Sequence, residues 1–208
     1  MMKLTTLFTQ SAQAVSATAI KVPDAKSALD QALSLCLHKE ACPLLVSGCD
    51  APISQTASEA CPPAHAKTFA APGLAPVLSG HLSAQCAKHQ IIPVFKDLRA
   101  HVGGIDGGFS MAELAIAETG TLVLASHDED QRLASMLCEV HAVYVSENRI
   151  FSTFQDAQSE IERLTAQAPG FVAFITGASR TADIERVLAL GVHGPLELHI
   201  FIGEADNA

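Results

Sequence analysis

Apolar side chains recur every three or four positions in one early segment, which is the spacing of a helix with one buried face. Residues 24–38 carry this pattern in full. Asp24 stands at its start, where a carboxylate accepts a hydrogen bond from a free amide of the first turn. We therefore expect a helix over 24–38 with Asp24 as its N-cap, and a second helix over 77–89.

Short, nearly continuous apolar runs predict strands. They lie at 44–46, 91–95, 121–125, 141–145, 171–175 and 198–202. Such strands are buried on both faces, and Pro93 places the second run at an edge or an end of its sheet. Helices are expected at 110–118, at 154–168 and from Asp183 toward Gly191. This alternation predicts a mostly parallel sheet with helices on both sides.

Two segments show neither the helical spacing of apolar residues nor a continuous apolar run. Residues 50–76 contain five prolines among alanines and serines, so we expect a long irregular stretch there. Residues 103–108 read Gly-Gly-Ile-Asp-Gly-Gly and predict a glycine-rich turn. This turn is not a dinucleotide fingerprint, because its glycines are not spaced as G-x-G-x-x-G.

Composition narrows the classes of partner. The chain has 208 residues, of which 49% are hydrophobic, enough for a sizeable core. Its formal net charge is −9 and it has no Trp, which speaks against nucleic acid as a partner. The six cysteines include no C-x-x-C pair, so we expect neither a zinc ribbon nor an iron–sulfur cluster in this chain. We expect a reduced, cytoplasmic protein without membrane insertion.

The strand expected at 171–175 runs into a segment suited to a small anion. A helix N-terminus after this strand would leave backbone amides free for an anion. The candidate binding residues are Thr176, Gly177, Ser179, Arg180 and Thr181. The alternative is simple helix capping by Ser179 or Thr181. Asp183 opposes an anion unless it points away or holds Arg180 in place.

A second candidate segment precedes the strand expected at 121–125. Glu118 is the candidate catalytic carboxylate, and Thr119, Gly120 and Thr121 follow it as candidate ligand-binding residues. The alternative is that Glu118 ends a helix and Gly120 makes a turn. Because both segments flank strand ends of one expected parallel sheet, we expect them across the same crevice.

Other polar residues carry weaker signals. His193 lies in the turn Gly-Val-His-Gly-Pro, and we expect it at the opposite end of its helix from the anion site. Cys138 and His141 have a spacing that metal ligands can use, but one such pair does not predict a metal site.

Three separated motifs resemble the LUD domain family in its stand-alone form. They lie at residues 117–124, 176–185 and 190–200. The resemblance implies a three-layer α/β/α fold of the NagB/RpiA/CoA-transferase-like class. It also implies a system that oxidises L-lactate to pyruvate, in which iron–sulfur partner subunits carry the electrons. Arg132 stands where the family has an arginine, and Asp106 where it commonly has a Gly-Ile-Thr turn.

We expect one domain over 1–208, with a helical and proline-rich part at 1–89 and a motif-bearing α/β core at 90–202. The resemblance implies a subunit of a lactate-oxidising complex that binds a small anionic ligand and no cofactor of its own. Two alternatives stay open. One is an independent enzyme acting on a phosphorylated or acyl substrate, and the other is a scaffold with a vestigial pocket.

Overall fold

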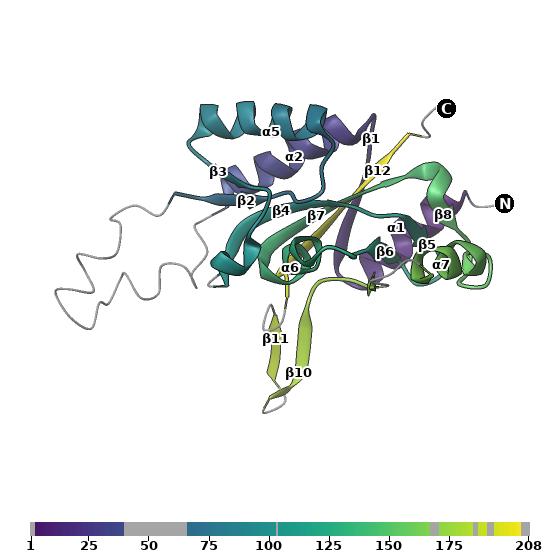
Figure 1. The fold of residues 1–208 in the computed structure, drawn as a ribbon. Coiled ribbons are helices and arrows are strands. Elements are labelled where there is room, and N and C mark those ends of the chain that lie inside the picture. Colours follow the sequence, from purple (N-terminus) through teal and green to yellow (C-terminus); the bar gives the residue numbers. More distant parts are fainter. Residues whose placement is uncertain are drawn as a thin grey trace.

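A six-stranded parallel sheet forms the centre of the molecule (Figure 1). The computed structural model describes residues 3–39, 66–102, 104–166, 171–184, 187–190 and 194–204, with no side chains from 180 to 190. In spatial order the strands are β1 (Ala17–Val22), β12 (Glu197–Gly203), β7 (Cys138–Ser146), β4 (Ile105–Met111), β2 (Thr68–Ala70) and β3 (Ile92–Val94). All neighbouring pairs are parallel, and β3 with Pro93 lies at an edge, as predicted.

Two helices cover one face of this sheet: α2 (Ala25–His38) and α5 (Pro76–His89). Both were predicted, α2 from its apolar spacing. The Asp24 carboxylate accepts a hydrogen bond from the Ser27 amide at 2.7 Å and caps α2. Leu29 and Leu33 of α2 pack with Phe109 and Phe201 of the sheet in one buried cluster.

The other face carries α1 (Leu4–Ala14), α6 (Glu129–Leu137) and a second, smaller sheet. The small sheet has the order β8 (Ile150–Phe151), β5 (Leu114–Ile116), β6 (Thr121–Ala125) and β9 (Val172–Ile175). Helix α7 (Gln158–Thr165) packs on its outer side. Short 3₁₀ helices, η1 (Leu98–His101) and η2 (Glu147–Arg149), precede β4 and β8. The result is the predicted α/β architecture of helices on both sides of a parallel sheet.

Several predicted elements are wrong in detail. The strands at 121–125 and 171–175 exist, but they pair antiparallel in the small sheet and do not belong to the parallel one. The helix predicted at 110–118 is instead the end of β4 followed by β5. The glycine-rich turn predicted at 103–108 is mostly central strand β4. Its glycines admit close neighbours, because a Cβ on Gly108 would lie 2.2 Å from the Cys138 sulfur.

The helix predicted from Asp183 toward Gly191 is also wrong. The chain forms an antiparallel hairpin of β10 (Arg180–Ile184) and β11 (Val187–Leu190), which projects from the body in Figure 1. Short apolar runs fit a strand or a helix equally well by spacing alone. The helix N-terminus expected to hold an anion is therefore absent from residues 180–184.

The amino-terminal part is integral to the sheet. β1 pairs with β12 over the whole strand, so residues before 90 complete the same core as the motif-bearing part. The irregular stretch predicted at 50–76 contains β2 in its described portion, and α5 begins at Pro76. The strand predicted at 44–46 lies outside the described residues. Within the part of the chain that is described, no helix combines the length and apolarity needed to cross a membrane.

Candidate functional site

A small cleft lies where the chain diverges from two neighbouring strands. After β2 the chain continues into α5 on one face of the sheet, whereas after β4 it continues into β5, β6 and α6 on the other. β2 and β4 are adjacent. Such a switch point opens a crevice at the carboxyl ends of the strands, where ligands of open α/β sheets bind.

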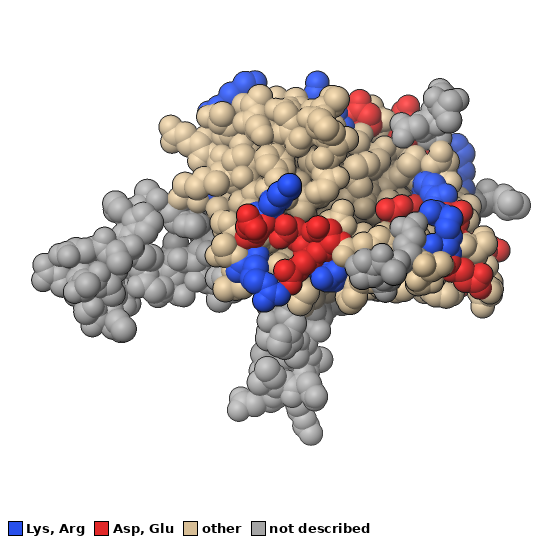
Figure 2. Space-filling model, in the orientation of Figure 1, with Lys and Arg blue, Asp and Glu red and all other residues tan. Residues whose placement is uncertain are grey.

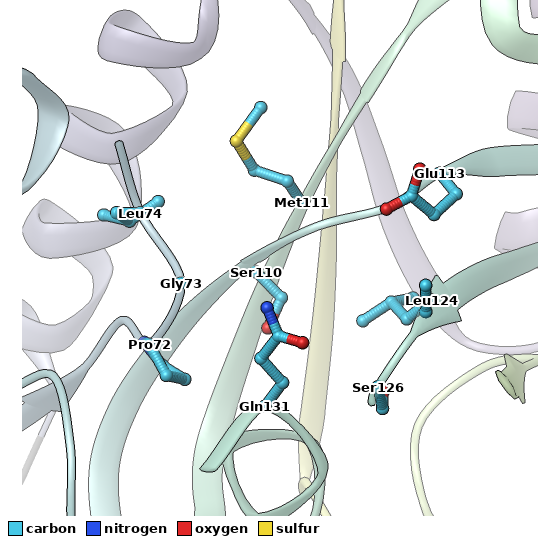
Figure 3. A pocket seen from close by; sticks show the side chains of 10 residues that line it. Pro72, Gly73, Leu74, Ser110, Met111, Glu113, Leu124, Ser126 and Gln131 are labelled. Atoms are coloured by element: carbon cyan, nitrogen blue, oxygen red, sulfur yellow. The ribbon is translucent and has the colours of Figure 1, made fainter. Parts of the chain in front are cut away.

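The cleft has a volume of about 130 Å³ (Figure 3). Its lining comes from the segments that follow β2, end β4, end β6 and begin α6. The residues are Pro72, Gly73, Leu74, Ser110, Met111, Glu113, Leu124, Ala125, Ser126 and Gln131.

Ser110 joins the cleft to a buried histidine. Its hydroxyl oxygen lies 2.9 Å from Nε2 of His141 on the neighbouring strand β7. His141 is fully buried, and burial lowers its pKa to about 4, so the imidazole is neutral near pH 7. Nδ1 of His141 has no hydrogen-bond partner among the described residues. An unpaired acceptor is less unusual in a protein interior than an unpaired N–H, so we assign the proton to Nε2. Nε2 then donates to Ser110, whose own hydroxyl proton is free to donate into the cleft.

Ser126 supplies a second hydroxyl. It is 1% exposed, and its Oγ has no partner among the described residues. Arg132 holds this segment, because its Nη1 donates to the carbonyl oxygens of Ser126 at 2.8 Å and of His127 at 3.3 Å. The same guanidinium lies over the Phe171 ring, 5.1 Å from its centroid. A buried hydroxyl without a protein partner is unusual, and a bound molecule in the cleft would satisfy it.

Glu113 and Gln131 complete the polar lining. The Glu113 backbone is fixed on both sides: its amide donates to the Val123 carbonyl, and its carbonyl accepts from Nε of Arg149, both at 2.9 Å. Its half-buried carboxylate makes no hydrogen bond or ion pair with the described residues, and Figure 3 shows it pointing into the cleft. Gln131 lies against Gly73, where an added Cβ would come within 2.4 Å of the Gln131 amide nitrogen.

The structure brings together part of the site predicted from sequence. Thr121 Oγ1 lies 2.7 Å from both Thr119 Oγ1 and Thr176 Oγ1. These three residues, called the threonine cluster below, lie where β6 begins and β9 ends. Gly120 makes its turn at a φ of 67° and packs on the backbone of α1. The two predicted segments do meet, but at the small sheet and not at the parallel sheet.

The threonine cluster and the cleft lie at opposite ends of β6. The strand runs from Thr121 to Ala125, which spans about 13 Å at the usual rise per residue. Glu118, the predicted catalytic carboxylate, lies beside the cluster and is exposed. Its Oε1 accepts a hydrogen bond from the Phe154 amide at 3.0 Å. Glu118 therefore holds the turn before α7 and does not line the cleft.

The predicted anion site loses its helix, and the hydroxyls of Thr176 and Ser179 belong to the described segment that follows β9. Gly177 packs on the Val15 carbonyl, and the Ser179 amide donates to the Pro195 carbonyl at 2.9 Å, so that amide is occupied. Arg180, Thr181 and Asp183 belong to β10, and their side chains are outside the description. His193 lies outside the described residues. Anion binding at 176–181 stays a prediction that rests on the threonine cluster and the charge of Arg180.

Asp106 has a structural role in the central sheet. It is fully buried near the start of β4, away from the Ser110 end. Its carboxylate accepts hydrogen bonds from the amide and the hydroxyl of Thr68, at 2.8 and 3.2 Å, and lies 3.9 Å from Nζ of Lys39. These bonds tie the start of β4 to the start of β2.

The cleft residues were missed by sequence reasoning. Ser110 was assigned to a helix, and Glu113, Ser126 and Gln131 carried no motif. One signal was present, since Ser110 and His141 are polar residues inside otherwise apolar runs that form neighbouring buried strands. Among the described residues, no three His, Cys, Asp or Glu side chains are grouped to hold a metal ion.

Comparisons with known proteins agree with this fold. A family model described as the LUD domain matches residues 5–202. A lactate utilization protein C of Shouchella clausii is 33% identical over 94 residues, which are 44% of this chain and 41% of that protein. Its counterpart in Bacillus subtilis is 34% identical over 93 residues, 43% of this chain and 39% of that protein.

An uncharacterized protein of Neisseria meningitidis serogroup B is 40% identical over 96 residues, 46% of this chain and 41% of that protein. The matched segments thus span about two fifths of these curated relatives. A crystal structure of a DUF162 family protein from Deinococcus radiodurans aligns with a TM-score of 0.60 and 18% identity, covering 96% of both chains. Because the family model covers nearly the whole chain, this protein belongs to the LUD domain family.

Proposed function

We propose that this chain is the component without an iron–sulfur cluster in an L-lactate utilization system. The observation that carries the proposal is family membership together with relatives named lactate utilization protein C. The cleft at the β2–β4 switch point is its small-molecule site, because it has the placement and the unpartnered polar groups of one.

Oxidation of L-lactate to pyruvate removes electrons that an acceptor must take up. The six cysteines of this chain lack cluster spacing, and Cys36, Cys86 and Cys138 are buried as free thiols. We therefore assign electron transfer to iron–sulfur partner subunits in the cytoplasm. In this proposal the chain binds a small ligand and supports the assembled complex.

A deletion experiment in the host of this protein tests the role. Cells that lack the chain are expected to grow normally on pyruvate and to lose growth on L-lactate, and the wild-type chain restores it. A tagged chain purified from lactate-grown cells is expected to retain partners that contain iron. Unchanged growth of the deletion strain on L-lactate would overturn the proposal.

An independent enzyme on an acyl or phosphorylated substrate is the second candidate, and the Ser110–His141 pair is the observation that favours it. In the other tautomer, with the proton on Nδ1, Nε2 would accept the Ser110 proton, which is the arrangement of an activated nucleophile. However, the lowered pKa of His141, about 4, makes it a weak base. Turnover of such a substrate by the purified chain alone, lost in Ser110→Ala, would decide for this candidate.

A further inference from the structure

We propose that the cleft selects a small ligand that is neutral or positively charged and donates hydrogen bonds, an alcohol or an amine, and that it rejects carboxylates and phosphates. This inference rests on the proposed function only in taking the cleft as the ligand site. It separates the cleft from the predicted anion site at the threonine cluster.

The first argument for this ligand class is the charge of the residues that line the cleft. Glu113 is the only ionisable residue of the lining, and no Lys, Arg or His among the described residues takes part in it. The nearby cations are engaged elsewhere. Arg149 donates to Glu160 at 2.8 Å and to the Glu113 carbonyl, while Arg132 is bound to backbone carbonyls. Among the described residues, no cation would offset the repulsion between the Glu113 carboxylate and an anion in the cleft.

The surroundings add to this negative field. Asp128, Glu129 and Asp130 stand at the start of α6, directly before Gln131 of the cleft. Figure 2 shows carboxylates gathered over this helix, with Lys and Arg side chains at the edges of the patch. Glu129 pairs with Arg99, whereas Asp130 accepts hydrogen bonds from the amides of η1 and stays without a cation partner among the described residues. Fields of one sign in a cleft favour ligands of the opposite charge.

The second argument is the set of hydrogen-bond donors and acceptors in the cleft. A carboxylate only accepts, so Glu113 needs a donor from the ligand. The hydroxyls of Ser110 and Ser126 lie across the cleft and can donate to a ligand oxygen. Met111 and Leu124 supply apolar walls between these polar ends. A hydroxyl or ammonium group therefore fits beside Glu113, with a short carbon skeleton along the apolar wall.

The volume limits the size of the ligand. A cleft of about 130 Å³ holds roughly four water molecules at about 30 Å³ each. Molecules the size of lactate or of a three-carbon amino alcohol suit this space. Since molecules of this size all fit, the cleft can distinguish them by their charge.

Three probes with the same carbon skeleton test the inference: L-lactate as the anion, L-lactamide as the neutral amide and (S)-1-amino-2-propanol as the cation. Calorimetric titration of the full chain near neutral pH is expected to rank the cation first and lactate last, about tenfold or more apart. Glu113→Gln is expected to weaken binding of the amino alcohol about tenfold and to remove most of the difference. Glu162→Gln, on the outer side of α7, is the matched control and is expected to leave all three affinities unchanged.

Ser126→Ala provides a second test, because it leaves the charge of the cleft unchanged. It is expected to weaken lactamide and the amino alcohol alike, without changing their order. Thermal melting of each variant checks that it is folded. A wild-type chain that binds lactate best, binds none of the probes, or keeps its ranking in Glu113→Gln would overturn the inference. Growth of the deletion strain on L-lactate does not depend on which probe binds best. A wrong inference about the ligand can therefore be told apart from a wrong proposed function.

Discussion

The Ser110 hydroxyl and His141 Nε2 form a diagonal pair across two central strands. In the register of β4 and β7, Gly108 lies beside His141 and Ser110 beside Val143. Ser110 is therefore two residues further along its strand, on the same face, and its oxygen reaches Nε2 at 2.9 Å. This pair connects the floor of the cleft to the middle of the sheet, so changes in His141 act on both stability and the cleft.

The buried neutral His141 makes stability depend on pH. Its pKa is about 4 in the folded chain and about 6.5 when unfolded, so the unfolded state binds more protons between these values. Its contribution is complete above the unfolded pKa and is lost as the pH falls toward the folded value. We expect the free energy of unfolding to drop by about 2 kcal/mol between about pH 7 and pH 5 from this residue.

Urea denaturation at several pH values measures this drop. The slope in this window is expected to shrink in His141→Gln and to persist in His89→Gln, because His89 is exposed. An equal slope in His141→Gln and the wild type would mean that His141 is not the group that titrates.

Two serine variants are expected to separate stability from binding. Ser110→Ala leaves Nε2 of His141 without its partner and is expected to cost about 1–3 kcal/mol of unfolding free energy. Ser126→Ala removes a buried hydroxyl that has no partner among the described residues, so stability is expected to stay the same or to rise slightly. Both variants are expected to weaken ligand binding in the cleft. Denaturation and titration of the same preparations give the comparison, and a large loss of stability in Ser126→Ala would reveal a partner for its hydroxyl.

The parallel sheet was predictable because its strands are buried on both faces. Val143 faces α1 and the small sheet, while Tyr144 faces α2, so neighbouring positions are both apolar and the run stands out. β4 was not predictable in this way, because Gly107 and Gly108 look like a turn. They are glycines because Cys36, Phe69 and Cys138 approach the strand closely, a packing reason that spacing does not show.

The threonine cluster was partly predictable and the cleft was not. Thr119, Thr121 and Thr176 belong to short motifs that each end or begin a strand, so their meeting follows from local sequence. The cleft is assembled by a change in the direction of chain connections between β2 and β4, and its residues come from four separate segments. Only the topology brings Ser126 and Gln131 to Ser110.

Anion binding near the threonine cluster is expected to depend on Arg180. Replacing Arg180 with Ala removes the charge and is expected to weaken phosphate binding by about 1.5–3 kcal/mol, the range for a hydrogen bond to a charged group. Glu162→Gln, on the outer side of α7 and outside the cleft, is the matched control, with unchanged phosphate affinity. Calorimetric titration with inorganic phosphate measures both variants. Equal binding by wild type and Arg180→Ala would leave Ser179 and Thr181 as structural residues of the hairpin.

The turn at Gly120 is expected to tolerate no side chain. Its φ of 67° is the left-handed region, which costs an L-residue about 1–2 kcal/mol. A Cβ there would also lie 2.4 Å from the backbone nitrogen of Ala12, and a helix backbone cannot move aside as a flexible side chain can. We expect Gly120→Ala to lower the unfolding free energy by more than about 2 kcal/mol and to loosen α1 from the threonine cluster.

Gly80 provides the matched comparison. It lies inside α5, and a Cβ at that position meets nothing within 4 Å. Gly80→Ala is expected to raise the unfolding free energy by about 0.5–1 kcal/mol, because alanine loses less backbone freedom on forming a helix. Urea denaturation of the two variants beside the wild type measures both effects. Opposite signs support the packing of α1 on the Thr119–Thr121 turn, whereas a neutral Gly120→Ala would show that the turn and α1 are not in contact in solution.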